Sequence, residues 1–243
     1  MKIYGYMPGW SVPDISPYVS KLIVYCRMTG IDYEMVPQGV PDLPNAPRHK
    51  LPYIETEDGF LPDSNEIIAH LKRTVGDPLD GDATASELAA MHAWMRMIDE
   101  HTYWCGVIQP RWRKDAGWEV YKPIIMMSAA PISEPVLEVL DGFRDRIVTQ
   151  FKNQGMGQKS DEEVFETFKT DVDALVTQLG DRPFFMGEAP RSIDAAVFTI
   201  LTHTIEAPFD WKGRDYVSAQ QSLKDYIDRM RGRFDLTWPH LSY

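Results

Sequence analysis

The sequence predicts a small mixed α/β domain followed by an all-helical domain. Strand-like and helix-like segments alternate over residues 1–78, whereas helical periodicity dominates residues 83–243. Between these regions, residues 76–82 read Gly-Asp-Pro-Leu-Asp-Gly-Asp, a polar stretch rich in residues that break helices and strands. We therefore place a linker at residues 79–82 and expect each flanking region to form its own domain.

The first domain is predicted to contain four strands and two helices. The first helix begins at Ser16, shows apolar side chains at helical spacing and ends at Gly30, a residue typical of helix C-caps. The second begins at Asp63, where Glu66 completes a capping box, and it ends at Gly76. This order of elements matches a thioredoxin-like domain. The predicted strands cover residues 3–7, 32–36, 51–55 and 60–62, with a proline-rich loop at 37–47.

The second domain is predicted to consist of helices alone. Capping boxes stand at residues 84–87 and 160–163, and an apolar stripe follows each of them. The first stripe runs to about Gln109, and Pro110 is expected to end that helix. The predicted helices cover residues 84–109, 133–153, 160–180, 192–205 and 218–230.

The composition excludes several classes of protein. With 243 residues, 44% of them hydrophobic, the chain can bury a large core without metals or disulfides. Its net charge of −11 argues against nucleic acid and anionic membranes as partners, but it leaves room for a small anionic ligand. No apolar run approaches the ~20 residues that span a bilayer. Two cysteines make no disulfide framework, so we expect a cytoplasmic protein, and the scattered histidines predict no metal site.

Ser16 is the candidate catalytic residue. It lies where a strand leads into a helix, and backbone N–H groups and the helix dipole there stabilise an anion such as a thiolate. Ser16 and Val19 stand where a Cys-x-x-Cys redox motif would have cysteines, which disfavours a thiol-disulfide oxidoreductase. A serine hydroxyl could instead donate a hydrogen bond to the thiolate of a ligand and lower its pKa. A plain N-cap, with Pro17 as the first helical residue, explains the same pattern.

Two further segments of the first domain are candidates for ligand binding. Pro52 opens a strand after a long loop, and a cis Leu51–Pro52 bond would turn the Leu51 backbone outwards to pair with an extended peptide. Asp63 and Ser64 open a helix whose first turn suits a carboxylate, and Lys50 could hold another carboxylate. The simpler explanations are a proline at a strand start, a capping box and a solvated lysine.

Together, these segments resemble the glutathione-binding domain of glutathione S-transferases, and the helical second domain extends the resemblance over essentially the whole chain. The resemblance implies that glutathione is the co-substrate and that Ser16 activates its thiol. A homodimer is also expected, because it is the habit of this family. The implied binding residues are Leu51 and Pro52 for the cysteinyl backbone, Asp63 and Ser64 for the γ-glutamyl group, and Lys50 for the glycyl carboxylate.

Three motifs resemble a narrower group within this family, the failed-axon-connections and metaxin-like branch. The three motifs are Val-Pro-Asp-Ile-Ser-Pro-Tyr at residues 12–18, His-Lys-Leu-Pro-Tyr-Ile at 49–54, and Glu-His-Thr-Tyr-Trp at 100–104 with Arg111 and Trp112 after it.

The chain departs from the family pattern at one helix start of the second domain. Glutathione S-transferases usually have Ser/Thr-x-x-Asp there, whereas this chain has Arg191-Ser192-Ile193-Asp194, with the hydroxyl one position late.

The resemblance to glutathione S-transferases also implies a pocket for a second substrate between the domains. Helical spacing places a methionine, a glutamate, a histidine and a tryptophan on one face, which suits a small organic electrophile. Aromatic residues and methionines at such spacing more often belong to the core, and Glu100 with His101 could simply join the domains. The candidate pocket residues are Met97, Glu100, His101, Trp104, Arg111 and Trp112.

The sequence therefore predicts a glutathione-dependent transferase of the serine type, which conjugates the glutathione thiol to a small hydrophobic electrophile. The alternative is a non-catalytic binding or assembly protein of the metaxin-like kind. The two differ in whether bound glutathione reacts.

Overall fold

The chain is described by a computed structural model that covers residues 1–127 and 134–241. Its sheet contains β1 (Lys2–Gly5), β2 (Glu34–Pro37), β3 (Tyr53–Thr56) and β4 (Gly59–Pro62). The strand order is β2-β1-β3-β4. Strand β1 pairs in parallel with β2 and antiparallel with β3, which forms a hairpin with β4. A β-α-β unit followed by a hairpin and a helix confirms the thioredoxin-like fold.

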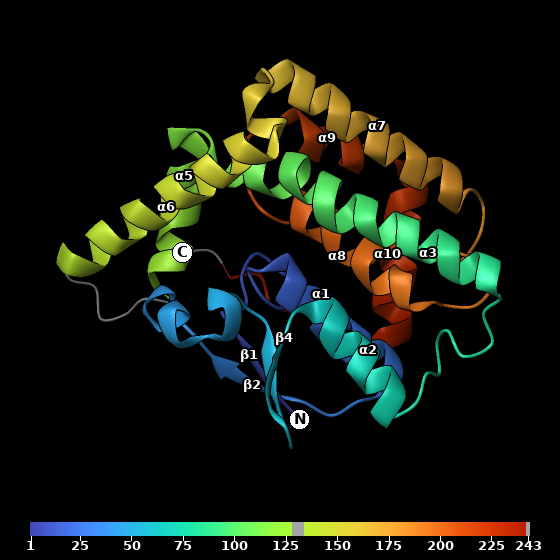
Figure 1. The fold of residues 1–243 in the computed structure, drawn as a ribbon. Helices are drawn as coiled ribbons and strands as arrows, with labels where there is room; N and C mark the ends of the chain where they lie inside the picture. The colour runs from blue at the N-terminus through green and yellow to red at the C-terminus, as the bar shows by residue number, and fades with distance from the viewer. Residues whose placement is uncertain (128–133, 242–243) are drawn as a thin grey trace.

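Helices α1 (Pro17–Thr29) and α2 (Ser64–Thr74) lie between the sheet and the second domain (Figure 1). Helix α1 ends at Gly30, as predicted, and the φ of 70° at this residue suits glycine because glycine lacks a Cβ. The proline-rich segment joins no strand ladder. It folds into two 3-10 turns, η1 (Val40–Asn45) and η2 (Pro47–His49).

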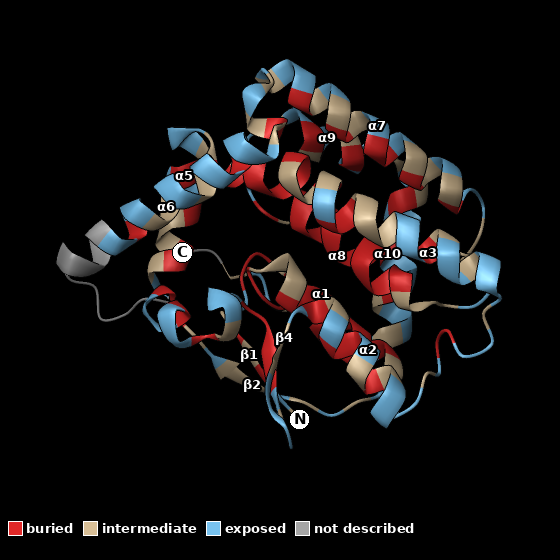
Figure 2. Cartoon of the chain, in the orientation of Figure 1, coloured by how far each residue is buried: buried red, intermediate tan, exposed pale blue. Residues whose placement is uncertain are grey.

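The second domain is helical throughout its described residues, which confirms the predicted fold class. Its centre is α8, in which every residue from 193 to 204 is buried (Figure 2). Helix α1 of the first domain packs against α8, so the two domains share an apolar interface. No helix among the described residues is long and apolar enough to cross a membrane. The helices are α3 (Ala85–Met97), α4 (Gln109–Trp112), α5 (Asp115–Met127), α6 (Glu134–Gln154), α7 (Asp161–Leu179), α8 (Ser192–Ile205), α9 (Lys212–Ser218) and α10 (Gln221–Phe234), with a 3-10 turn η5 (Met156–Gln158).

The predicted end of the first helix of the second domain, at about Gln109, is wrong. Helical backbone continues past Pro110 to Trp112, where the run that begins at Ala85 ends. Between α3 and α4 the backbone forms two π-helical segments, η3 (Ile98–Thr102) and η4 (Trp104–Ile108). Such wide turns often occur at functional sites.

Other helix boundaries also differ from the prediction. Helices α5 and α9 were not predicted, because α5 contains Pro123 and α9 is short and has no capping side chain. The last helix begins at Gln221 instead of residue 218. The predicted start of α6 at Ser133 lies outside the described residues.

The predicted capping boxes have mixed outcomes. The boxes at Thr84 and Ser160 form as expected, with both reciprocal hydrogen bonds. At the start of α2, the Asp63 carboxylate accepts from the backbone N–H groups of Asn65 and Glu66. The Glu66 carboxylate does not reach back to close the box, because it pairs with Arg48 at 2.9 Å.

Candidate functional site

A cavity of about 540 Å³ opens between the two domains, a volume in the usual range for small-molecule sites. The starts of α1 and α2 and the loop before β3 form one wall, and the helices from α3 to α6 form the opposite wall. Ten of the twelve candidate residues line it: Ser16, Lys50, Leu51, Pro52, Asp63, Ser64, Glu100, Trp104, Arg111 and Trp112.

Ser16 lies at the N-terminus of α1, on the cavity wall. Its backbone N–H donates to Asp14 Oδ1 at 2.7 Å, and its Oγ accepts a long hydrogen bond of 3.5 Å from the Val19 N–H. This cap uses only the oxygen of the hydroxyl, so its proton remains available to a ligand. The position combines a hydroxyl donor with the positive end of a helix dipole, and both stabilise an anion.

The loop before β3 presents free backbone and a cation at the cavity. The Leu51–Pro52 peptide bond is cis. The ladder between β1 and β3 begins at Tyr53, so the Leu51 backbone lies beyond it. Lys50 is exposed at the rim of the cavity. An extended peptide with a carboxylate therefore finds both a pairing edge and a positive charge here.

Asp63 and Ser64 bring the start of α2 to the same cavity. Asp63 has φ 74° and ψ 122°, a backbone conformation that residues with a Cβ rarely adopt. Both capping bonds of Asp63 end on Oδ1, which leaves Oδ2 for a ligand's ammonium group. Ser64 is buried beside it. Its hydroxyl bonds to no other side chain or backbone group of the described chain, so it can bind a ligand carboxylate.

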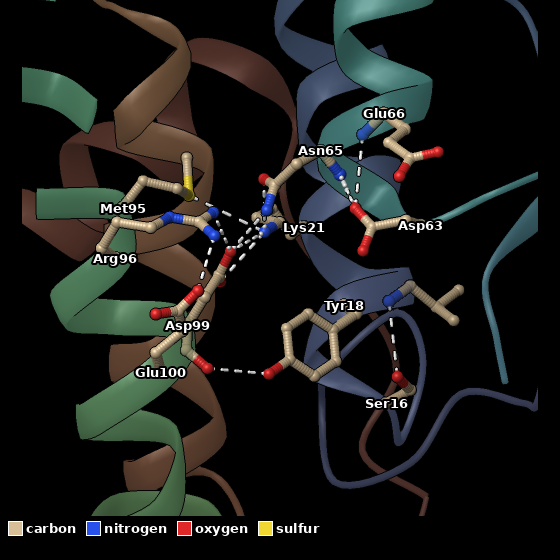
Figure 3. A network of polar contacts seen from close by, with 11 residues as sticks. Ser16, Tyr18, Lys21, Asp63, Asn65, Glu66, Met95, Arg96, Asp99 and Glu100 are labelled. Atoms are coloured by element: carbon tan, nitrogen blue, oxygen red, sulfur yellow. Dashed lines mark hydrogen bonds and ion pairs between the residues drawn. The ribbon is translucent and has the colours of Figure 1, made fainter. Parts of the chain in front are cut away.

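A buried ion pair joins the domains behind this wall, and the sequence did not reveal it. Lys21 on α1 lies 2.8 Å from Asp99 Oδ2, with 2% and 9% of the two side chains exposed. Asn65, the residue after Ser64, accepts from Lys21 at 3.0 Å and donates to Asp99 at 2.8 Å (Figure 3). Burial lowers the pKa of Lys21, and the Asp99 carboxylate opposes that shift. The network fixes the first turn of α2 against η3 of the second domain.

Arg111 is fully enclosed at the inner end of the cavity. Its guanidinium donates to the Ile15 carbonyl at 2.7 Å and to His203 Nδ1 at 2.8 Å. Because Nδ1 accepts, His203 carries its proton on Nε2 and donates to Ser20 Oγ at 2.9 Å. Burial, followed by the Arg111 charge, holds the pKa of His203 well below its usual value, so the imidazole is neutral.

Met97 and His101 do not line the cavity, which corrects the prediction that they share a face with Glu100 and Trp104. The predicted face assumes 3.6 residues per turn, whereas the π-helical turns from residue 98 onward are wider and shift the register. His101 Nδ1 donates instead to Asp171 on α7 at 2.8 Å.

His101, Cys105 and Asp171 form a cluster of side chains of the kinds that can bind metals. Their nitrogen, sulfur and oxygen atoms lie within 4.8 Å of one another. Hydrogen bonds between helices account for this cluster, since Thr102 also donates to Asp171 at 2.7 Å.

Both cysteines are buried and unpaired. Burial raises the pKa of the Cys26 thiol to about 12. Burial also raises the pKa of Cys105 well above its usual value, and the nearby Asp171 carboxylate adds to the shift. Neither thiol has the exposure or the low pKa of a redox cysteine, which argues against a thiol-disulfide oxidoreductase.

Family models and related sequences identify the family of this chain. The chain matches the glutathione S-transferase N-terminal domain model over residues 17–117 and the corresponding C-terminal domain model over residues 168–230. It is 44% identical over 236 residues to the isoprene-epoxide–glutathione S-transferase of Rhodococcus sp. (strain AD45), an alignment that covers 96% of this chain and 99% of that protein.

Two more distant relatives belong to the branch that the motifs suggested. The chain is 25% identical over 242 residues to Failed axon connections of Drosophila melanogaster, which covers 95% of this chain and 57% of that protein. It is 24% identical over 222 residues to Metaxin-1 of Mus musculus, which covers 85% of this chain and 66% of that protein. The chain thus spans less than two thirds of either relative.

Solved structures show the same fold. A glutathione S-transferase from Methylobacterium radiotolerans JCM 2831, in complex with glutathione sulfonate, superimposes with a TM-score of 0.63 at 17% identity. The match covers 100% of this chain and 96% of that chain. The two domain models and the relative with 44% identity show that the chain belongs to the glutathione S-transferase family.

Proposed function

We propose that this chain conjugates glutathione to a small hydrophobic epoxide. The observation that carries the proposal is that Ser16, Leu51 and Ser64 line one cavity, and that its opposite wall includes five aromatic side chains. These belong to Tyr103, Trp104, Trp112, Tyr121 and Phe143. A relative with 44% identity over nearly the whole chain is an isoprene-epoxide–glutathione S-transferase. In this proposal the first domain holds the tripeptide and the second domain holds the epoxide.

Each proposed binding residue has a role that its position supports. The Ser16 hydroxyl donates to the thiolate and lowers the pKa of the thiol from ~8.5. The Leu51 backbone, next to Pro52, pairs with the cysteinyl residue. The Ser64 hydroxyl and the Asp63 carboxylate bind the carboxylate and the ammonium of the γ-glutamyl group. Lys50 lies near the glycyl carboxylate.

Replacing Ser16 with alanine is expected to lower kcat/KM for conjugation by about a hundredfold, the usual effect of removing one donor to a developing or fixed anion. The pKa of bound glutathione, read from thiolate absorbance against pH, should rise toward its free value. Ser160→Ala is the matched control, because Ser160 caps α7 in the same way. An unchanged rate across several electrophiles would contradict the thiolate role of Ser16.

Ser64→Ala is expected to weaken glutathione binding about tenfold or more at pH 7, because a hydrogen bond to a carboxylate contributes about 1.5–3 kcal/mol. Titration calorimetry measures this directly. Ser86→Ala changes an exposed serine in the first turn of α3 and should leave the affinity unchanged. If wild type and Ser64→Ala bind equally well, the γ-glutamyl group lies elsewhere.

A non-catalytic binding or assembly protein remains the second candidate, because Failed axon connections and Metaxin-1 are also similar to this chain. Glutathione binding without any conjugation of epoxides or halides would favour it.

We also propose that the protein is a cytoplasmic homodimer. Its domains cover residues 1–78 and 83–243, with the linker at 79–82. Both buried thiols are free, as is usual in a reducing compartment. Sedimentation equilibrium tests the dimer.

A further inference from the structure

Three tyrosines that the sequence analysis did not single out line the same cavity as Ser16. Tyr6 directly follows β1, Tyr103 lies between η3 and η4, and Tyr121 belongs to α5. Within the described residues, neither Tyr6 nor Tyr103 has a hydrogen-bond partner for its hydroxyl. The guanidinium carbon of Arg111 lies 5.2 Å from the centre of the Tyr121 ring. Three segments far apart in sequence thus bring tyrosine side chains to one cavity.

The rings of these tyrosines are held by aromatic neighbours. Tyr103 packs between Tyr18 and Trp104, with ring centroids 4.9 and 5.5 Å away. Tyr121 meets Trp112 edge to face at 4.9 Å. Because Tyr18 is two residues from Ser16, the first of these contacts places Tyr103 close to the start of α1. Rings fixed in this way keep their hydroxyls in place without the entropy cost of ordering them on binding.

The three hydroxyls remain protonated in the cavity that they line. Burial raises the pKa of Tyr6 well above its usual value, and Tyr121 and Tyr103 add to the shift. Burial also raises the pKa of Tyr103 and of Tyr121, while the Arg111 charge opposes both shifts. At neutral pH all three groups are therefore O–H donors with no negative charge of their own.

Arg111 supplies a positive charge beside the hydroxyls. Two of its nitrogens are occupied by Ile15 and His203, whereas its buried Nε–H has no acceptor among the described residues. Its acidic neighbour Asp14 has a pKa raised well above the usual value by burial, so Asp14 offers little compensating charge. A buried cation of this kind stabilises negative charge that develops nearby.

We propose that Tyr6, Tyr103 and Tyr121, supported by the Arg111 charge, form an oxyanion-binding site for the oxygen of the electrophile. The inference rests on the proposed function and deepens it. The glutathione sulfur attacks one epoxide carbon, a C–S bond forms, and the C–O bond breaks with its electron pair moving to oxygen. The tyrosine hydroxyls hydrogen-bond to this alkoxide, which takes a proton from solvent and leaves as the hydroxyl of the product.

The test compares two electrophiles of similar size. Isoprene monoepoxide leaves an alkoxide when attacked, whereas allyl chloride releases chloride and needs no donor for oxygen. Tyr6→Phe, Tyr103→Phe and Tyr121→Phe each remove one hydroxyl and keep the ring. For each variant, kcat/KM is measured with both electrophiles at saturating glutathione. Tyr216→Phe is the control, since its hydroxyl donates to Asp173 on α7, away from the cavity.

We expect at least one of the three variants to lower the epoxide-to-chloride ratio of kcat/KM by about tenfold to a hundredfold, the usual effect of removing an oxyanion donor. The control should keep the wild-type ratio. Equal losses with both electrophiles, or no loss in any variant and in the triple variant, would overturn the oxyanion site. If the wild-type protein conjugates neither electrophile, the proposed function itself fails, and the two results are distinguishable.

Discussion

Lys21→Ala is expected to lower the free energy of unfolding by about 3–5 kcal/mol, because it leaves the Asp99 carboxylate buried without its cation. Lys21 makes two short ion-pair contacts to Asp99, at 2.8 and 3.0 Å, and it also donates to Asn65. The Asn65 amide donates to Asp99 as well, at 2.8 Å, but it carries no charge. Arg96 lies farther from Asp99, at 3.6 Å, and its own carboxylate partner is Glu100 at 2.7 Å. It therefore compensates only in part. Urea unfolding followed by circular dichroism measures the loss.

A double variant separates the buried charge from simple loss of packing. Lys21→Met with Asp99→Leu removes both charges and keeps apolar volume, and should recover most of the stability. The exposed pair of Lys169 and Asp173 is the matched control, so Lys169→Ala should change the unfolding free energy by about 0.5 kcal/mol or less. A loss below about 1 kcal/mol in Lys21→Ala would mean that water or Arg96 stabilises Asp99.

Replacing Lys21 should also weaken glutathione binding, because Asn65 follows Ser64 directly and is hydrogen-bonded to both Lys21 and Asp99.

The link between Lys21, Asp99 and Asn65 could not be predicted from the sequence. Lys21 lies within the apolar stretch of α1, and a charge there is usually solvated at the edge of a helix. Only the arrival of Asp99 from the second domain makes its burial possible, and that contact spans 78 residues.

The fold class was predictable because local signals agree with one another. Helix starts were marked by residues with capping hydroxyls, and the end of α1 was marked by a glycine. The structure confirms all four positions: Ser16, Thr84 and Ser160 as N-caps and Gly30 as a C-cap. Such signals need only a few neighbouring residues. The residues of the first domain that we propose to bind glutathione also stand at element ends, so the order of elements was enough to bring them to one cavity.

The opposite wall of the cavity was predicted less well. A face drawn at 3.6 residues per turn fails where the backbone is π-helical, which is why Met97 and His101 were placed wrongly. The aromatic residues of α5 were missed with their helix. Tyr6 had a signal that went unused, since the side chain that follows the first strand of a β-α-β unit lies at the edge where ligands bind.

Asp194→Ala is expected to be as damaging as the loss of Lys21, at about 3–5 kcal/mol of unfolding free energy. The buried Asp194 carboxylate accepts from the Arg191 and Phe185 backbone N–H groups and from the Tyr226 hydroxyl, all at 2.8 Å. Alanine takes the acceptor from the buried Phe185 N–H group and the partly buried Arg191 N–H group, and it leaves the Tyr226 hydroxyl only a longer bond of 3.2 Å to the Asp194 carbonyl. An unpaired buried donor costs about 1–3 kcal/mol. Ser192 does not cap the start of α8. Its hydroxyl donates to Asp80 of the linker instead.

A double-mutant cycle distinguishes this account from a general loss of helix α8. Tyr226→Phe removes only one of the three donors and should cost about 1–1.5 kcal/mol. In the Asp194→Ala background the same change should cost less, since the hydroxyl has already lost its shorter bond, the one to the carboxylate. Additive losses would show that Tyr226 and Asp194 do not depend on each other. Coupled losses would show that the Asp194 carboxylate links α8 to α10 and to the loop before α8. Because α1 packs against α8, this link also supports the wall of the cavity that α1 forms.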